Sequence, residues 1–433
     1  MRISLFQSIL FGVFGIAALI GLFVFATYTS TGGSNAIGTV VVWGVLPKAD
    51  INAALVAITQ TDQTLKSVTY IEKDPRTLPS DLATAIATGG APDLVLASQE
   101  QLRTLARFIT PIPLATLSAR TFADSFIQEG GLFAAPGGTG FYGIPLLVDP
   151  LVLFSNRAIL SSSGIVRPPA TWEALTGLVP LVARLTPSQQ ITRALIALGS
   201  YDNVHNARGI ISALFLQTGV PISGYSTIGN FAADLGNSAA SGEPPGPAVL
   251  KFYSQFADPS KVSYTWNASL PDSQQAFLSG DLALYLGYAS EARFLRSANP
   301  NLDFDVATFP QPATAAAKST YGLVYALMVP NGAKNPNGAF QAAVLLANSA
   351  IPLLVATTGL TPATLSDLTV PPPDPIAALA YAEALYAKGW LSPGREATDG
   401  IFSGMISNVI SGRSTPETVI PIAENALTSL LQQ

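Results

Sequence analysis

Runs of apolar residues alternate with amphipathic stretches along most of the chain, a pattern that predicts strands and helices in turn. Residues 39–45 (TVVVWGV) form a β-branched run with the length of a buried strand, and a helix is predicted after it. Residues 67–72 predict a second strand, 81–90 a helix that stops at a Gly-Gly pair, and 94–98 a third strand. This order is typical of a parallel sheet with right-handed crossovers.

The pattern continues with longer elements. Residues 143–156 predict a long extended run, and 274–291 predict a helix end, a glycine turn and a strand. Another strand is expected at 321–329 and a helix at 336–348. The segment VPPPDP at 370–375 predicts a break before a helical C-terminus. The exported part of the chain is therefore expected to be an α/β protein.

The N-terminus determines the expected compartment. Residues 3–26 are almost all apolar and, at about 1.5 Å per residue, would reach roughly 36 Å, enough to cross a hydrocarbon core of about 30 Å. Arg2 favours a cytoplasmic start, which places the rest of the chain on the extracytoplasmic face. We expect a single-pass anchor within residues 1–28 and a tether at 29–38, with secretion after signal cleavage as the alternative.

Composition excludes several classes of function. The 433 residues carry 22 Lys and Arg against 27 Asp and Glu, a net charge of −5, and the basic residues are scattered, so nucleic-acid binding is not expected. The absence of Cys excludes disulfides, thiolate metal sites and cysteine nucleophiles, and a single His cannot build a two-histidine zinc site. No cofactor and no metal are predicted.

The search for catalytic motifs gives little. Gly138, Gly140 and Gly143 match the spacing GxGxxG, but they precede a strand, whereas a dinucleotide site needs them after one. His205 has two interpretations: it can orient a substrate or belong to a triad, or it can be a structural residue at a helix start, which is the commoner case.

Several segments resemble, in order, the extracellular solute-binding proteins of ABC importers (family 1, maltose- and oligosaccharide-binding-like). The matching segments are APDLVLAS at 91–98, YGIPLLVDPLVLFSNRAILSSSGIVRPPATWEAL at 142–175, QQAFLSGDLALYLGY at 274–288, FPQP at 309–312, YALMVPNGAKNPNGAFQAAVLLAN at 325–348, and the helical tail from 405. Each match is short, but their order and spacing cover nearly all of residues 38–433.

The resemblance implies a type II periplasmic-binding-protein fold, in which two α/β lobes joined by a hinge clamp a ligand between them. Lobe 1 would comprise 39–148 plus 300–355, and lobe 2 would comprise 149–299 plus 356–433. The three hinge crossings would fall near 147–152, 321–326 and 356–361. Hinge closure around the ligand is the motion expected of such a fold.

The same resemblance nominates ligand-binding residues, since family members line the cleft with residues from strand ends and add aromatic platforms. Aromatic rings offer flat faces to sugars, and carboxylates accept hydrogen bonds from vicinal hydroxyls. The candidates are Trp43, Gln99, Glu100, Asp149, Tyr201, Trp266, Tyr288, Tyr321 and Trp390, with Ser98 beside them. Asp149 can instead merely precede Pro150 in a turn, and Glu100 can be a first-turn helix residue.

We therefore predict a membrane-anchored, non-enzymatic protein that captures a small solute, with a sugar or oligosaccharide favoured, and delivers it to ABC permease subunits. Platforms of the maltose-binding proteins align here with Ala97, Ser290 and Asp399, which argues against a maltodextrin ligand. Glu291 and Asp399 could instead contact an amine, a cation or further hydroxyls. The alternatives are an exported glycoside hydrolase that uses Glu100 and Asp149, or a sensor or adhesin on the same fold.

Overall fold

The computed structural model describes residues 37–225, 231–238 and 242–432, and the chain divides into two compact units. The first unit is Met1–Val148 with Val324–Pro371, and the second is Asp149–Leu323 with Pro372–Gln433. The chain therefore passes between the units three times. The predicted anchor at 1–28 and most of the predicted tether lie outside the described residues.

Two of the predicted lobe boundaries differ from those in the structure. The strand Phe304–Ala307 (β12) pairs with residues Leu153 to Asn156, which lie in the second unit, so the chain returns to the first unit at Val324 and not at 300. The short strand Thr361–Pro362 (β14) pairs with Val148 and Leu147 of the first unit, so the third crossing comes after Pro371, inside the proline-rich segment, and not near 356–361.

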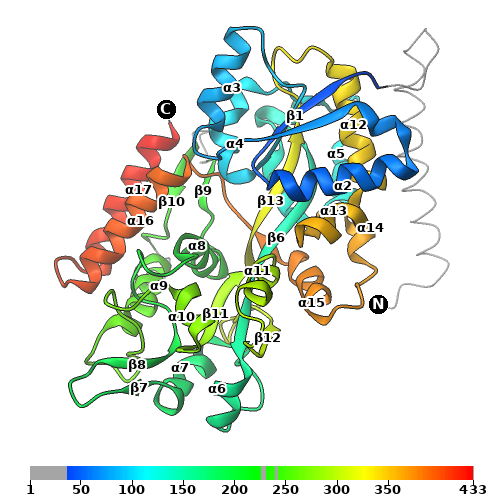
Figure 1. Ribbon diagram of the computed structural model, residues 1–433. Coiled ribbons are helices and arrows are strands. Elements are labelled where there is room, and N and C mark those ends of the chain that lie inside the picture. The colour runs from blue at the N-terminus through cyan, green and yellow to red at the C-terminus, as the bar shows by residue number, and fades with distance from the viewer. Residues whose placement is uncertain (1–36, 226–230, 239–241, 433) are drawn as a thin grey trace. The chain divides into compact units, whose positions relative to one another are not determined.

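The first unit is built around parallel strands, as the sequence predicts. Val40–Gly44 (β1) lies between Val68–Glu72 (β2) and Leu94–Ser98 (β3) and is parallel to both, and Thr320–Met328 (β13) pairs antiparallel to β3 (Figure 1). The helices are α2 (Lys48–Thr61), α3 (Leu78–Ala87), α4 (Gln99–Leu105), α5 (Ala119–Ser125), α12 (Pro336–Ser349), α13 (Ile351–Thr358) and α14 (Leu365–Leu368), and the short strands are β4 (Ile112–Pro113) and β5 (Gly140–Phe141). Alternate side chains of β1, including Val40 and Val42, enter the core with Leu94 and Leu96 of β3.

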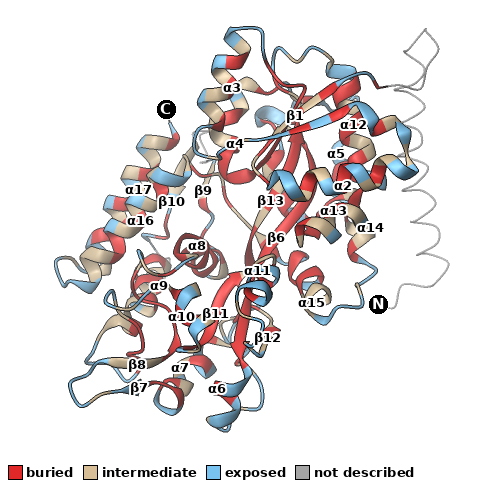
Figure 2. Ribbon diagram, viewed as in Figure 1, coloured by how far each residue is buried: buried red, intermediate tan, exposed pale blue. Residues whose placement is uncertain are grey.

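The second unit is centred on the long strand Ile144–Asn156 (β6), all of whose residues are buried (Figure 2). Leu282–Tyr288 (β11) pairs antiparallel to β6 and parallel to Ile191–Ile196 (β8). The helices are α6 (Arg157–Ser162), α7 (Trp172–Val182), α8 (Ala207–Gln217), α9 (Pro245–Ser254), α10 (Ser273–Ser279), α11 (Glu291–Ala298), α15 (Pro375–Ala384), α16 (Arg395–Ile410) and α17 (Pro416–Leu431), and the remaining strands are β7 (Arg184–Leu185), β9 (Ile222–Tyr225), β10 (Phe231–Asp234) and β15 (Ala387–Lys388).

Short 3-10 turns complete the described chain: Gln63–Ser67, Ala106–Phe108, Gln128–Phe133, Pro136–Gly138 and Gln255–Ala257. The glycine turn predicted within 274–291 is confirmed, because Gly280 ends α10 with a φ of 83°, a conformation that costs glycine little. Among the described residues, no single helix is long and apolar enough to span a bilayer. Helices α12 and α13 reach this length and hydropathy only when taken together, and a 76° bend separates them.

Candidate ligand-binding site

Parallel strands in each unit end at a common edge, and several of the candidate residues follow these strand ends. In the first unit β1, β2 and β3 end at Gly44, Glu72 and Ser98. In the second unit β8 and β11 are parallel, and their carboxyl ends lead into the loop before α8 and the turn before α11. Ligands of open α/β sheets bind outside the carboxyl ends of the strands. Each unit therefore presents one candidate half-site.

Trp43, near the end of β1, carries a cation on one face of its ring. The Nζ of Lys73 lies 3.9 Å from the Trp43 ring centroid, and the same Nζ is 3.2 Å from Asp81 Oδ2. The indole itself is half-buried. A cation over an indole face is attracted by the ring quadrupole, so Lys73 holds the plane of Trp43. Lys73 was not a candidate in the sequence, because a strand-to-strand contact of this kind leaves no local signal.

The segment after β3 begins α4 with a capping box. The hydroxyl of Ser98 accepts the Glu100 N–H at 3.3 Å, and the Gln101 Oε1 accepts the Ser98 N–H at 3.0 Å. The Gln99 Oε1 accepts the Val324 N–H at 2.7 Å and so ties α4 to β13. Gln99 is buried within this framework, whereas Glu100 places a buried carboxyl group in the first turn of α4.

Asp149, the first residue of the second unit, holds the turn that follows β11. Its carboxylate accepts the Ser290 N–H at 3.1 Å and the Ser290 hydroxyl at 2.6 Å. Burial raises the pKa of Asp149 from 3.8 to about 7, against the lowering effect of these hydrogen bonds, and the charge of Glu291 raises it further. The structure thus gives Asp149 a positioning role for the start of α11.

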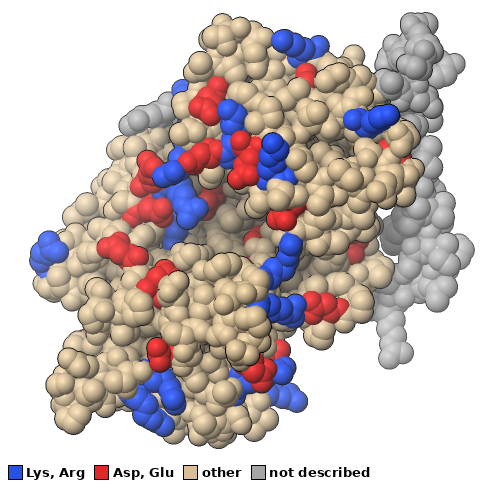
Figure 3. Space-filling model, in the orientation of Figure 1, with Lys and Arg blue, Asp and Glu red and all other residues tan. Residues whose placement is uncertain are grey.

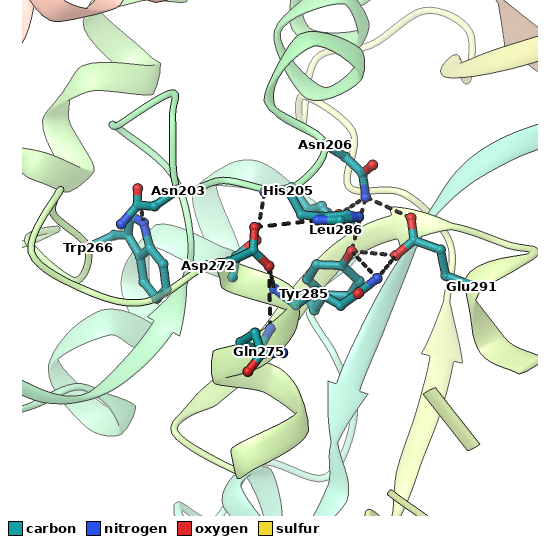
Figure 4. A network of polar contacts seen from close by, with 11 residues as sticks. Asn203, His205, Asn206, Trp266, Asp272, Gln275, Tyr285, Leu286 and Glu291 are labelled. Atoms are coloured by element: carbon teal, nitrogen blue, oxygen red, sulfur yellow. Dashed lines mark hydrogen bonds and ion pairs between the residues drawn. The ribbon is translucent and has the colours of Figure 1, made fainter. Parts of the chain in front are cut away.

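Glu291 is surrounded by donors of its own unit (Figure 4). Its Oε1 accepts from Asn206 Nδ2 at 2.8 Å and from the Tyr288 N–H at 2.9 Å. Its Oε2 accepts from Gln274 Nε2 at 2.8 Å and from the Tyr285 hydroxyl. Because four donors converge on this carboxylate, Glu291 joins α8, α10 and β11, and its hydrogen-bonding capacity is filled within its own unit.

The loop before α8 is fixed by its own polar side chains (Figure 4). Asn203 Nδ2 donates to the carbonyl oxygens of Asn267 and Leu270, both at 2.9 Å. Figure 4 shows Asn203 beside Trp266 and Asp272 beside His205. The His205 N–H donates to the Ser273 hydroxyl at 2.9 Å, and its Nδ1 lies 3.4 Å from Asp272 Oδ2. Ser273 thus faces the backbone of His205 and not its ring, an arrangement that does not form a catalytic triad. These hydrogen bonds hold the loop before α8 against residues 267–273.

Tyr201 and Asp399 join this loop to α16. The Tyr201 hydroxyl donates to Asp399 Oδ1 at 2.6 Å, and burial followed by the hydrogen bond to Asp399 raises the pKa of Tyr201. Arg208 Nη1 lies 3.7 Å from the same Oδ1, and Arg395 Nε lies 3.7 Å from Oδ2. Sequence reasoning singled out Tyr201 and Asp399 separately, but missed Arg208 and the contact that brings all of them together.

Tyr288, at the end of β11, packs against α8 where the helix has a glycine. A Cβ atom at Gly209 would lie 2.7 Å from the Tyr288 hydroxyl oxygen and 3.3 Å from Cδ1 of Tyr321. Tyr288 is half-buried, whereas Tyr321 is fully buried in the core of the second unit. The absence of a side chain at Gly209 therefore lets Tyr288 lie against the backbone of α8.

The two remaining tryptophan candidates are core residues of the second unit. Trp266 is 1% exposed and its Nε1–H donates to Asn203 Oδ1 at 3.1 Å, and Trp390 is 2% exposed and its Nε1–H donates to the Ser212 hydroxyl at 3.0 Å. Because each indole has its N–H satisfied and its faces covered, these side chains stabilise the unit by packing. Tyr321 belongs to the same core.

On the face shown in Figure 3, acidic and basic side chains stand beside one another, and wide uncharged areas lie between them. Among the described residues, no group of three or more His, Asp and Glu side chains is arranged to hold a metal ion. The half-sites instead offer aromatic rings, carboxylates and guanidinium groups, which suit a polar, hydroxylated ligand.

A family model for bacterial extracellular solute-binding proteins matches residues 61–350. The chain belongs to this family. Members of this family are solute-binding proteins, the class of protein that the sequence predicts. Comparison with curated protein sequences gives no match.

Three similar solved structures support the fold. The cyclic α-maltosyl-1,6-maltose binding protein of Arthrobacter globiformis has a TM-score of 0.72 at 16% identity, over 91% of this chain and 99% of its own. The maltose/maltodextrin-binding domain of Bdellovibrio bacteriovorus, bound to maltotriose, has a TM-score of 0.66 at 15% identity, over 91% and 100%. The Thermus thermophilus maltotriose binding protein, also bound to maltotriose, has a TM-score of 0.63 at 17% identity, over 90% and 99%. At these identities the likeness establishes the maltose-binding type of α/β fold.

Proposed function

We propose that this protein captures a sugar or oligosaccharide outside the cytoplasm and delivers it to the permease subunits of an ABC importer. Membership in the solute-binding family supports capture of a small solute. The three similar structures are sugar-binding proteins by name, which favours this ligand class. The chemistry of the half-sites fits the same class, because aromatic rings and carboxylates together recognise sugar faces and hydroxyls.

One observation carries the proposal: each unit places an aromatic ring and a carboxyl group at the carboxyl edge of its parallel strands. The first unit offers Trp43 and Glu100, and the second offers Tyr201, Tyr288 and Asp399. We propose that a bound solute is held by groups of both units and that binding stabilises a closed arrangement through hinge motion. Asp149 would then act indirectly, through its hold on Ser290, and Gln99 through its hold on β13.

The proposal is tested by titrating the purified full-length protein with a sugar panel. Maltose, maltotriose, trehalose, sucrose, raffinose, cellobiose and mannotriose are followed by tryptophan fluorescence, calorimetry and the shift in melting temperature, in a detergent without a sugar headgroup. We expect one or more of these sugars to raise the melting temperature in proportion to its saturation. No response to any sugar, with a folded protein, would contradict the ligand class.

Transport is tested separately from binding. Deleting the gene is expected to abolish uptake of the bound sugar, and re-expression is expected to restore it. Normal uptake without the protein would instead favour a sensor or adhesin on the same fold. Conversion of the sugar by the purified protein would revive the hydrolase alternative, which needs Glu100 and Asp149 to flank one glycosidic bond.

We further propose that residues 3–26 anchor the protein in the membrane with the binding units on the extracytoplasmic face. The proposal rests on the apolar sequence of this segment and on Arg2 before it. The expected result is recovery of the protein in the membrane fraction with an intact N-terminus and with protease-accessible units in spheroplasts. A soluble product that begins near residue 27 would show a cleaved signal peptide instead.

A further inference from the structure

Asp399 has one carboxylate oxygen engaged and one available. Its Oδ1 accepts the Tyr201 hydroxyl at 2.6 Å and is 3.7 Å from Arg208 Nη1. Its Oδ2 is 3.7 Å from Arg395 Nε, beyond hydrogen-bond distance, and accepts no hydrogen bond from any residue in the described ranges. The Asp399 side chain is 35% exposed, so the side chain is accessible from solvent.

The carboxylate is also held in place from three elements. Tyr201 comes from the loop after β8, Arg208 from the first turn of α8, and Asp399 and Arg395 from α16. The raised pKa of the Tyr201 phenol keeps it a hydrogen-bond donor, and Arg208, at 8% exposed, is fixed by the packing around it. A ligand would therefore meet an acceptor whose geometry is set in advance, which reduces the entropic cost of binding.

Asp399 and Arg395 present a hydrogen-bond acceptor beside a hydrogen-bond donor. Asp399 Oδ2 accepts, and the guanidinium of Arg395, one turn earlier in α16, donates. Two neighbouring sugar hydroxyls offer the complementary pair, because one can donate to the carboxylate while the other accepts from the guanidinium. An aromatic platform at position 399 would instead bind the apolar face of a sugar and would be indifferent to its individual hydroxyls.

We propose that Asp399, positioned by Tyr201 and Arg208 and assisted by Arg395, determines specificity for a sugar unit that presents two free vicinal hydroxyls. This inference rests on the proposed sugar-binding function and narrows its ligand. The unit bound here is hydrogen-bonded at its edge, so a sugar substituted at these hydroxyls binds poorly. Removing the hydroxyl that donates to Asp399 costs affinity only while the Asp399 carboxylate is present.

The test uses the full-length protein, the tightest-binding sugar of the panel and its monodeoxy analogues. For the unaltered protein, at least one deoxy analogue is expected to bind tenfold or more weakly than the parent sugar. Asp399→Ala is expected to lose tenfold or more in affinity for the parent and to lose most of its discrimination against that analogue. The affinity of Asp399→Asn for the parent sugar is expected to lie between those of the unaltered protein and Asp399→Ala, because its amide keeps one acceptor oxygen.

Controls separate this role from a structural one. Glu396→Gln, at an exposed position in the first turn of the same helix, is expected to bind the parent sugar as the unaltered protein does. Tyr201→Phe, which keeps the ring but not the donor, is expected to weaken binding less than Asp399→Ala while reducing the same discrimination. Melting curves show that each variant is folded.

The outcomes are distinct. If the unaltered protein binds no sugar, the proposed function fails and this inference fails with it. If it binds a sugar but Asp399→Ala binds the parent and its analogues with unchanged affinities, the proposed function stands and this inference is overturned. Equal weakening of the parent and the analogues in a folded Asp399→Ala protein also overturns it, because a residue that acts only through packing would give that result.

Discussion

Asp149 accepts both the backbone N–H and the hydroxyl of Ser290, across 141 positions in sequence. Because Asp149 is the residue at which β6 enters the second unit, this pair fixes the turn between β11 and α11 to the crossing strand. A carboxylate next to a proline in the first crossing is therefore more than a turn residue. Its burial also makes it sensitive to pH.

The pH dependence of stability follows from the raised pKa of Asp149. The pKa rises from 3.8 to about 7 on folding, so the folded state binds the proton more tightly and is stabilised at low pH. This stabilisation is lost as the pH rises toward about 7. Each tenfold difference in proton affinity between the folded and unfolded states corresponds to about 1.4 kcal/mol. Because the pKa changes from 3.8 to about 7, the contribution of Asp149 to the unfolding free energy is at most roughly 4 kcal/mol. Asp149→Asn is expected to flatten the decline in unfolding free energy between pH 5 and 7.

Urea unfolding at pH 5, 6, 7 and 8 measures this effect. Asp124→Asn, at an exposed helical position, is the matched control and should retain the slope of the unaltered protein. An unchanged slope in Asp149→Asn would contradict the prediction.

Burial of Glu383 is expected to make a second contribution of the same sign to the pH dependence of the unfolding free energy. This α15 carboxyl group is 3% exposed and accepts the Phe309 N–H at 3.3 Å, and burial raises its pKa from 4.5 to about 7 against the effects of that hydrogen bond and of Lys318. Glu383→Gln keeps an acceptor for the Phe309 N–H while removing the titration. We expect a smaller loss of stability between pH 5 and 7, additive with that of Asp149→Asn. A steeper loss in the double variant than in either single variant would show the assignment to be wrong.

The local pattern was enough to predict elements, but not the contacts between distant segments. The strands predicted at 39–45, 67–72 and 94–98 correspond to β1, β2 and β3, because strand period and turn residues are local signals. The third crossing was misplaced because β14 is a strand of two residues whose pairing with β6 depends on residues more than 200 positions away.

The candidate site shows the same limit at the level of side chains. Trp266 and Trp390 were reasonable aromatic candidates, but the partners that bury their N–H groups, Asn203 and Ser212, lie 63 and 178 positions away. Lys73 and Arg208 were missed for the corresponding reason, since a cation above an indole or beside a carboxylate has no sequence motif. Residue type and strand ends thus predicted the region of the ligand-binding site. Tertiary contacts decide which of its side chains are accessible to a ligand.

Trp43 is expected to be the fluorescent reporter of ligand binding. Trp266 and Trp390 are buried in the core of the second unit, whereas Trp43 is half-buried at the end of β1 with Lys73 on one face. A sugar bound at this edge changes the surroundings of Trp43 and not those of the core indoles. Trp43→Phe should therefore lose most of the ligand-dependent fluorescence change, and calorimetry should show weakened binding. Trp390→Phe is the control and should retain the change, and a change that persists in Trp43→Phe would exclude Trp43 as the reporter.

Gly209→Ala tests whether Tyr288 must lie against α8. An added Cβ would come within 2.7 Å of the Tyr288 hydroxyl oxygen, so the ring has to move. Alanine stabilises a helix interior by about 0.5–1 kcal/mol relative to glycine, and this gain opposes the cost of the displacement, so we expect a net stability change within about 1 kcal/mol. If Tyr288 contacts the ligand, affinity for the sugar falls several-fold in a protein of nearly unchanged stability.

Gly404→Ala, in α16 where an added Cβ meets nothing within 4 Å, is the matched control and is expected to stabilise the protein without altering affinity. Equal affinities in the two variants would remove Tyr288 from the ligand-binding edge of the second unit, because the displaced hydroxyl would then have no effect on the solute.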